Sequence, residues 1–148
     1  MRSTPLSHVH ILLVDDNKMG LTARQSVLEE QGYRITVSTS ADEAMELFRQ
    51  SDIKLVVTDY RMPKINGIEL IRRLREERKD LPVVLLSGYV DPLGLNEDTT
   101  GADAVIQKSA HEIPNLLRAV NRLLRRQTLK KSAARQAAPR TKARRAGG

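Results

Sequence analysis

The stretch DIKLVVTDYRMPKINGIEL, residues 52–70, holds a short apolar run that ends at a single acid, Asp59, before a Pro and an Asn-Gly pair break the pattern. The run at residues 53–57 is too short for a helix, is rich in β-branched residues and is apolar on both faces. Such a run is typical of a strand that is buried on both sides in a parallel sheet. Ligands bind at the carboxyl ends of such strands, so Asp59 is a candidate functional residue. Asp59 alone fits an ordinary turn aspartate equally well. The residues at the other strand ends are needed to distinguish the two interpretations.

Signals for strands and helices alternate along the whole chain. Expected strands lie at residues 9–14, 33–38, 53–57, 81–86 and 104–107, and expected helices lie at 18–31, from Ser40, from Asn66 to about Arg78, and at 113–124. One Pro and two Gly between Val90 and Gly101 predict a fourth helix that is short or irregular. The pattern predicts an α/β fold with a doubly wound five-stranded parallel sheet in the flavodoxin-like order 2-1-3-4-5.

Four of the five expected strands end in residues that can carry chemistry. The first ends in Asp15 and Asp16, the third in Asp59, the fourth in Ser87 and the fifth in Lys108. In the order 2-1-3-4-5 the first and third strands are neighbours, so the three carboxylates would repel one another unless a cation intervenes. Carboxylates at a partly open site suit Mg²⁺, and the hydroxyl and ammonium groups suit phosphate oxygens. The set therefore fits phosphoryl transfer to an aspartate.

Charge divides the chain into two unlike parts. Residues 1–124 contain 16 Lys+Arg against 18 Asp+Glu, a net charge of −2, whereas residues 125–148 contain 9 Lys+Arg and no acid. Because no large apolar residue follows Leu129, the basic part cannot bury enough surface to offset its chain entropy. We therefore expect one folded domain at residues 8–125 and a disordered basic tail at 126–148. The tail is either a solvated end or a segment that binds nucleic acid without sequence specificity.

The composition excludes several classes of protein. The chain has no cysteine, which excludes disulfides and thiolate metal sites. Its apolar runs are too short to cross a bilayer, and its first residues contain no signal-peptide core. We expect a cytoplasmic protein with no membrane partner.

The motifs VDDNK, VVTDYRMPKINGIEL and VVLLSGY, with the strand before Lys108, resemble a response regulator receiver (CheY-like) domain over about residues 8–125. The resemblance implies that Asp59 accepts a phosphoryl group from a histidine kinase or phosphotransfer protein in a two-component phosphorelay. It implies that Ser87 hydrogen-bonds the phosphoryl group and that Lys108 pairs with Asp59 or its phosphate. It also implies an Mg²⁺ site formed by Asp16, by Asp15 through water, by Asp59 and by the backbone carbonyl of Arg61.

The resemblance further implies a single-domain phosphoacceptor that acts through a downstream partner or the tail. It would not be an enzyme beyond slow self-catalysed phosphorylation and dephosphorylation. An aspartate-based phosphatase is disfavoured, because such enzymes generally have a second acid where this chain has Arg61.

Two positions depart from the family pattern. Val105 stands where receivers usually have an aromatic switch residue, and Ser109 stands where they usually have proline. Tyr89 could respond to the site instead, although covering apolar surface is its simpler role. The departures motivate an alternative function, a phosphate-independent pseudo-receiver that binds proteins, with nonspecific nucleic-acid binding through the tail.

Overall fold

The computed structural model describes residues 9–88 and 95–147, with side chains up to residue 133. Its strands are β1 (His10–Val14), β2 (Arg34–Ser38), β3 (Leu55–Asp59), β4 (Val83–Ser87) and β5 (Ala104–Gln107). Its helices are α1 (Lys18–Glu30), α2 (Ala41–Gln50), α3 (Gly67–Glu77), α5 (Glu97–Thr100) and α6 (Glu112–Gly147). The strands pair in parallel in the order β2-β1-β3-β4-β5, which confirms the predicted fold class and sheet order.

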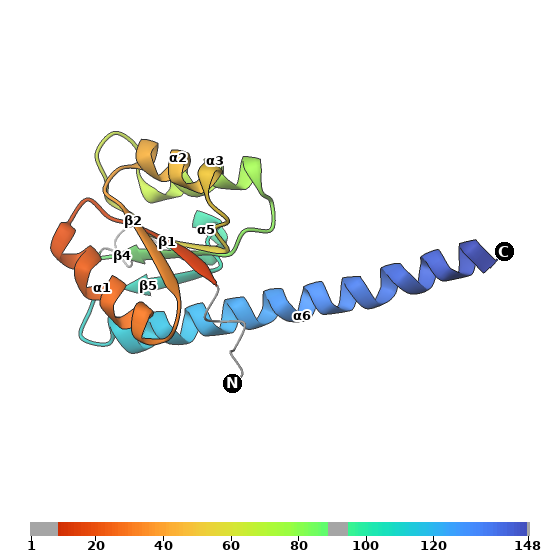
Figure 1. Ribbon diagram of the computed structural model, residues 1–148. Helices are drawn as coiled ribbons and strands as arrows, with labels where there is room; N and C mark the ends of the chain where they lie inside the picture. The colour runs from red at the N-terminus through yellow and green to blue at the C-terminus, as the bar shows by residue number, and fades with distance from the viewer. Residues whose placement is uncertain (1–8, 89–94, 148) are drawn as a thin grey trace.

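The sheet separates two apolar layers. Helices α1 and α6 cover one face, and α2 and α3 cover the other (Figure 1). Successive residues of β1 alternate between the layers, because neighbouring side chains of a strand point to opposite faces. Ile11 and Leu13 pack with α1 and α6, whereas Leu12 and Val14 pack with α2 and α3. Burial on both faces explains why the central strands are apolar throughout, and it leaves the strand ends for polar groups.

Polar caps fix where the helices begin, at Ser40 and Asn66 as the sequence predicts and at Asn17 before α1. The side chains of Asn17, Ser40 and Asn66 each accept a backbone N–H from the first turn of α1, α2 and α3 respectively. Gly32, just after α1, has a φ of 99°, the left-handed conformation in which helices commonly end. The caps after β1 and β3 place the start of a helix directly beside the carboxyl end of each strand.

Gly67 brings α3 close to the end of β3. A Cβ at this position would lie 2.4 Å from the backbone oxygen of Asp59 and 2.8 Å from Leu85 Cδ1. The Gly67 N–H donates to the Tyr60 carbonyl over 2.8 Å. Any side chain here would push the β3–α3 loop away from the strand, so Gly67 holds that loop over the site.

The last helix is longer than the sequence analysis expected. The structure has α6 as a continuous helix that ends at Gly147, whereas we expected a helix end near Leu124 and disorder from residue 126. Residues 115–138 contain no Gly or Pro and are rich in Ala, Arg, Lys, Gln and Leu, which favour helix. Figure 1 shows α6 extending well past the edge of the sheet. The domain boundary at residue 125 stays a prediction.

The predicted fourth helix lies partly outside the described residues. Tyr89 also lies outside them. Within them, α5 is a single turn from Glu97 to Thr100 that ends at Gly101, which has a φ of 81°. In the parts of the chain that the structure describes, none of the helices combines the length and apolar character needed to cross a membrane.

Candidate functional site

The carboxyl ends of β1, β3 and β5 open into a cleft of ≈ 600 Å³. Residues from three chain segments line it: Asp15, Asp16, Asn17, Asp59, Tyr60, Arg61, Met62, Asn66 and Lys108. The structure therefore brings together four of the five predicted strand-end residues, which lie up to 93 positions apart in the sequence. We call this region the acidic cleft.

Three carboxylates converge in the acidic cleft. Oxygen atoms of Asp15, Asp16 and Asp59 all lie within 4.8 Å of one another. Asp15 and Asp59 are buried, and Asp16 is exposed. A cluster of hard oxygen donors with one open side is the donor set that Mg²⁺ prefers, so the residues present fit this ion. The charge repulsion that the sequence predicts is thus present in the fold.

Asp59, the last residue of β3, is 5% exposed. Burial raises the pKa of its carboxyl group, and the neighbouring Asp15 carboxylate adds to the rise. Hydrogen bonds from Lys108 and from the Tyr60 backbone N–H oppose this shift without cancelling it. The carboxylate is therefore poorly solvated, and its surroundings favour neutralisation by a proton or by a cation.

Lys108 supplies a cation directly at this acid. Its Nζ lies 2.7 Å from Asp59 Oδ1 and 3.7 Å from Asp15 Oδ2. The backbone N–H of Lys108 donates to the Ser87 carbonyl over 2.9 Å, which fixes the end of β5 against the end of β4. Lys108 therefore contacts Asp59 from the end of β5, which is separated from β3 by β4.

Ser87 and Arg61 take the places that the sequence predicts, and their roles stay predictions. Ser87 is the buried last residue of β4, next to β3 in the sheet. Arg61 lies in the loop after β3 and lines the cleft. Both residues make further interactions within the protein. Arg61 follows Asp59 by two positions in the chain, and Ser87 ends the strand next to β3.

Sequence reasoning missed a buried ion network behind the cleft. Arg24 of α1 is 7% exposed, and its Nη1 lies 2.7 Å from Asp15 Oδ2. Its Nε lies 2.5 Å from Oε2 of Glu112, the first residue of α6. Burial works against the charged guanidinium, but the hydrogen bonds to Glu112 and Asp15 outweigh it and raise the pKa of Arg24. The available signal was an arginine on the inward stripe of a predicted helix, beside Leu21 and Leu28.

The two positions that depart from the family pattern lie within β5, at Val105, and just after it, at Ser109. Val105 is partly buried against the α2–α3 layer, and its N–H donates to Glu97 Oε2 over 3.3 Å. No cis peptide occurs within residues 9–88 or 95–147, so the bond between Lys108 and Ser109 is trans, as expected without proline. Val105 therefore contributes to apolar packing at the place where an aromatic switch residue was expected.

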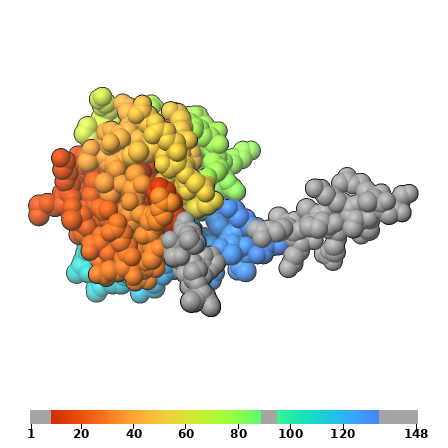
Figure 2. Space-filling view, viewed as in Figure 1, coloured from red at the N-terminus to blue at the C-terminus, as the bar shows by residue number. Residues whose placement is uncertain are grey.

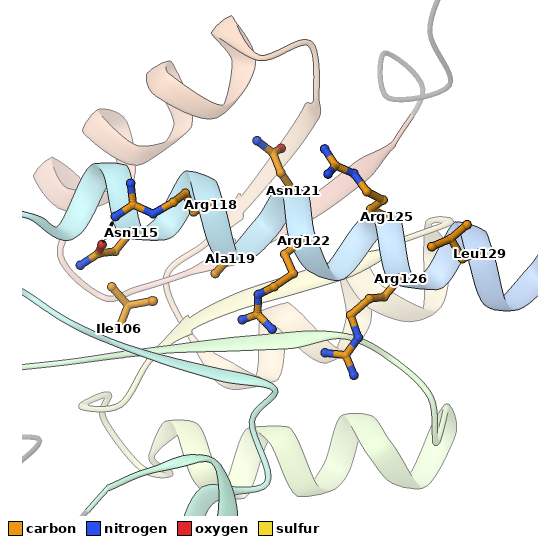
Figure 3. Close-up of a pocket in the computed structure, with 9 residues that line it drawn as sticks. All are labelled: Ile106, Asn115, Arg118, Ala119, Asn121, Arg122, Arg125, Arg126 and Leu129. Carbon is orange, nitrogen blue, oxygen red and sulfur yellow. Dashed lines mark hydrogen bonds between the residues drawn. The ribbon is translucent and has the colours of Figure 1, made fainter.

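A second concave surface lies along α6, away from the acidic cleft. It has a volume of ≈ 730 Å³ and is lined by Ile106 of β5 and by one side of the helix. Four exposed guanidinium groups, which we call the arginine face, dominate it: Arg118, Arg122, Arg125 and Arg126. Arg122 and Arg126 point the same way from the helix (Figure 3). The last part of α6 with described side chains projects from one side of the domain (Figure 2).

The chain matches the family model for the response regulator receiver domain over residues 11–135. It is 31% identical to the response regulator SaeR of Staphylococcus aureus over 118 residues, which cover 79% of this chain and 51% of SaeR. Two solved structures are similar in both fold and sequence. The receiver domain of the Francisella response regulator 1452 is 28% identical with a TM-score of 0.71, covering 80% of this chain and 98% of that one. The response regulator TrrA of Thermotoga maritima, in complex with Mg(2+)-BeF, is 30% identical with a TM-score of 0.70, covering 78% of this chain and 98% of that one.

The fold and the cleft define the class of protein, and the matches agree with it. This chain belongs to the response regulator receiver domain family and forms the receiver domain of a two-component response regulator. It spans about half the length of SaeR.

Proposed function

We propose that this receiver domain accepts a phosphoryl group on Asp59 from a histidine kinase or phosphotransfer protein, with Mg²⁺ held in the acidic cleft. The observation that carries the proposal is the convergence of three carboxylates and Lys108 at the end of β3. We further propose that the protein acts in the cytoplasm as a phosphoacceptor that relays a signal to a downstream protein. Its only catalysis would be slow phosphorylation and dephosphorylation of itself.

The residues of the cleft have separate roles in this proposal. An Asp59 oxygen forms a bond to phosphorus while the bond from phosphorus to the donor's imidazole nitrogen breaks, and the released imidazole takes up a proton from solvent. Lys108, already 2.7 Å from Asp59, balances the charge gained on phosphorylation. Ser87 donates its hydroxyl to a phosphoryl oxygen. Mg²⁺ would be held by Asp15, Asp16, Asp59 and the Arg61 carbonyl, and when bound it neutralises phosphoryl oxygens.

Incubation with acetyl phosphate and Mg²⁺, followed by intact mass measurement, tests the proposal. We expect the wild type to gain one phosphoryl group and Asp59→Asn to gain none, because the acyl phosphate requires that carboxylate. Equal labelling of the two proteins would show that another residue is the acceptor. No labelling of either protein, with Mg²⁺ binding intact, would favour the phosphate-independent alternative.

The arginine face supports a second function, nonspecific binding of duplex nucleic acid by α6. Among the described residues, no acid forms an ion pair with Arg118, Arg122, Arg125 or Arg126. Arg118 donates a hydrogen bond to Asn115 Oδ1, and exposed guanidinium groups without an acid partner can contact phosphates. Helix α6 continues beyond this face into a segment whose sequence is rich in basic residues. Because the segment has no aromatic residue to stack on bases, we expect no sequence recognition.

Salt dependence of duplex DNA binding tests this second function. If about five basic residues contact phosphates, the log-log slope of affinity against salt should be roughly −4 to −5. We expect the full chain to bind at low salt with this slope and a version that ends at Leu124 not to bind. Leu124 is the last residue of the apolar layer on this side, so the truncation leaves the core intact. Equal binding by both versions, or by neither, would contradict the proposal.

A matched pair of charge variants separates the arginine face from charge in general. Arg122→Gln/Arg126→Gln removes two cations from the face, and Lys18→Gln/Lys79→Gln removes two exposed cations elsewhere. We expect the first variant to lose affinity and about two units of salt slope, and the second to bind like the wild type. The same loss in both variants would mean that only net charge matters.

A further inference from the structure

A buried arginine connects the acidic cleft to the start of the last helix. Arg24 donates from Nη1 to Asp15 on β1's carboxyl side and from Nε to Glu112 on α6. The side chains of Arg24, Asp15 and Glu112 are 9%, 2% and 13% exposed, so the network is almost closed to water. Ion pairs this deep are far less screened than pairs on the surface.

The local sequence makes room for this arginine. A Cβ on Gly20 would lie 2.8 Å from Arg24 Nη1 and 3.4 Å from Asp15 Oδ2. The glycine one turn before Arg24 therefore leaves the space that the guanidinium occupies beside Asp15. Arginine is rarely this buried unless it is paired, because desolvation of the charge is costly. The two acids, 9 and 88 positions away in the sequence, supply that pairing.

We propose that Arg24 is a built-in counter-cation of the acidic cleft that competes with Mg²⁺ for Asp15 and is held by Glu112 when the metal is bound. This inference rests on the proposed metal site. Asp15 Oδ2 already faces two cations, Arg24 at 2.7 Å and Lys108 at 3.7 Å. A divalent ion that binds Asp15 is repelled by the Arg24 guanidinium, since like charges a few ångströms apart repel strongly in a poorly solvated site. Glu112 gives the guanidinium a second acid, so its charge stays compensated.

The network also offers a path from the cleft to α6. Glu112 follows Lys108 by four positions, and its backbone N–H donates to the Ser109 carbonyl over 3.1 Å. The start of α6 is thus tied to the cleft twice, by the chain from Lys108 and by the ion pair with Arg24. Neither connection involves Val105, the position where the aromatic switch residue is missing. A change in the Arg24 partners on metal binding would therefore reach α6 directly.

Replacement of Arg24 by methionine, which has a similar length and no charge, tests the inference by calorimetric titration of the full chain with Mg²⁺. We expect Arg24→Met to bind Mg²⁺ about tenfold more tightly than the wild type. Its unfolding temperature should be lower in EDTA, because two buried acids lose their partner, and added Mg²⁺ should restore most of the loss. A merely structural role predicts the opposite change in affinity, since a loosened site binds metal more weakly. Affinity that is unchanged or weaker in this variant overturns the inference.

Glu112→Gln provides a second, milder variant that also keeps the inference testable if Arg24→Met fails to fold. With Glu112 neutral, Arg24 has only Asp15 as an acid partner, so we expect Mg²⁺ affinity to fall several-fold. Unchanged or tighter binding would overturn the role of Glu112. Exposed Lys18→Met and Glu30→Gln carry the same charge changes and should alter the affinity by at most about twofold.

Measurements on the wild type distinguish a wrong metal site from a wrong role for Arg24. If the wild type shows no Mg²⁺ binding, the proposed metal site is wrong and the inference falls with it. If the wild type binds Mg²⁺ and Arg24→Met binds equally well, the proposed function stands and only the role of Arg24 is overturned.

Discussion

In the acidic cleft Asp15 and Asp59 are buried and each has a cation 2.7 Å away, Arg24 and Lys108 respectively, whereas the four guanidinium groups of the arginine face are exposed and have no acid partner among the described residues. The cleft is assembled from the ends of β1, β3 and β5, and the arginine face lies on a single helix. Buried charges act on one another because water screens them weakly, and exposed charges act mainly on a partner that approaches from solution. The cleft is therefore suited to a small ion and a phosphoryl group, and the helix to an extended polyanion.

The largest effect that sharpens this contrast is expected for Asp16→Asn. Asp16 is the exposed member of the carboxylate cluster, so its loss removes a ligand without disturbing the core. We expect Mg²⁺ affinity to fall by at least about tenfold and phosphorylation by acetyl phosphate to fall with it. Stability without metal should be equal or higher, because one repulsive charge is gone. Calorimetry and thermal unfolding in EDTA measure both changes, and unchanged Mg²⁺ affinity would show that the metal site is misplaced.

Lys108→Ala tests whether the cation of the cleft serves the phosphate or the fold. The lysine side chain is 29% exposed and contacts acids rather than the apolar layers, so we expect the variant to fold. It should still be labelled by acetyl phosphate, although less, and lose most of the change in unfolding temperature that phosphorylation produces. Circular dichroism of the labelled and unlabelled protein provides the measurement. A globally unfolded variant would instead mark Lys108 as structural.

A smaller effect is expected for the stability of Asp59→Asn. The folded protein raises the pKa of Asp59, chiefly by burial and then by Asp15, so ionisation of this group opposes folding. Between the pKa values of the unfolded and folded states the folded protein binds more protons, and stability from this group falls as pH rises through that window. Asp59→Asn should therefore unfold at a temperature a few degrees higher at neutral pH without metal. The difference should vanish toward pH 4, and a variant that is less stable at pH 7 would contradict this.

The smallest effect is expected on the arginine face. Arg122→Gln/Arg126→Gln removes exposed charges that have no described ion partner, so the unfolding temperature should stay close to that of the wild type. Arg24→Met, which also removes positive charge, should unfold at a much lower temperature in EDTA because its charge is buried and paired. Thermal unfolding of the two variants in one buffer makes the comparison. A similar loss in both would mean that burial is not what separates the two regions.

Much of the fold followed from local sequence signals. The apolar runs gave all five strands, with β5 at its predicted bounds and the others shifted by a residue or two. Ser40 and Asn66 cap the helices that they were expected to cap, whereas the cap of α1 is Asn17, one of three adjacent residues that could have served. These features depend on side chains that act on their own neighbouring backbone, so a short window of sequence contains the necessary information. The strand-end residues were also identifiable, because the order of a doubly wound sheet dictates which ends are adjacent.

The sequence by itself determined the class of fold, the caps and the residues at the strand ends, and only the tertiary structure decided which of the other charges meet. Arg24 was visible as an arginine on an inward helix stripe, but its partner Glu112 is 88 positions away on the last helix. That contact depends on how α1 and α6 pack against the same face of the sheet. The distances between the three carboxylates likewise depend on the register in which β1 and β3 pair. Long-range side-chain pairs form only after the layers have packed, because no local interaction fixes the distance between them.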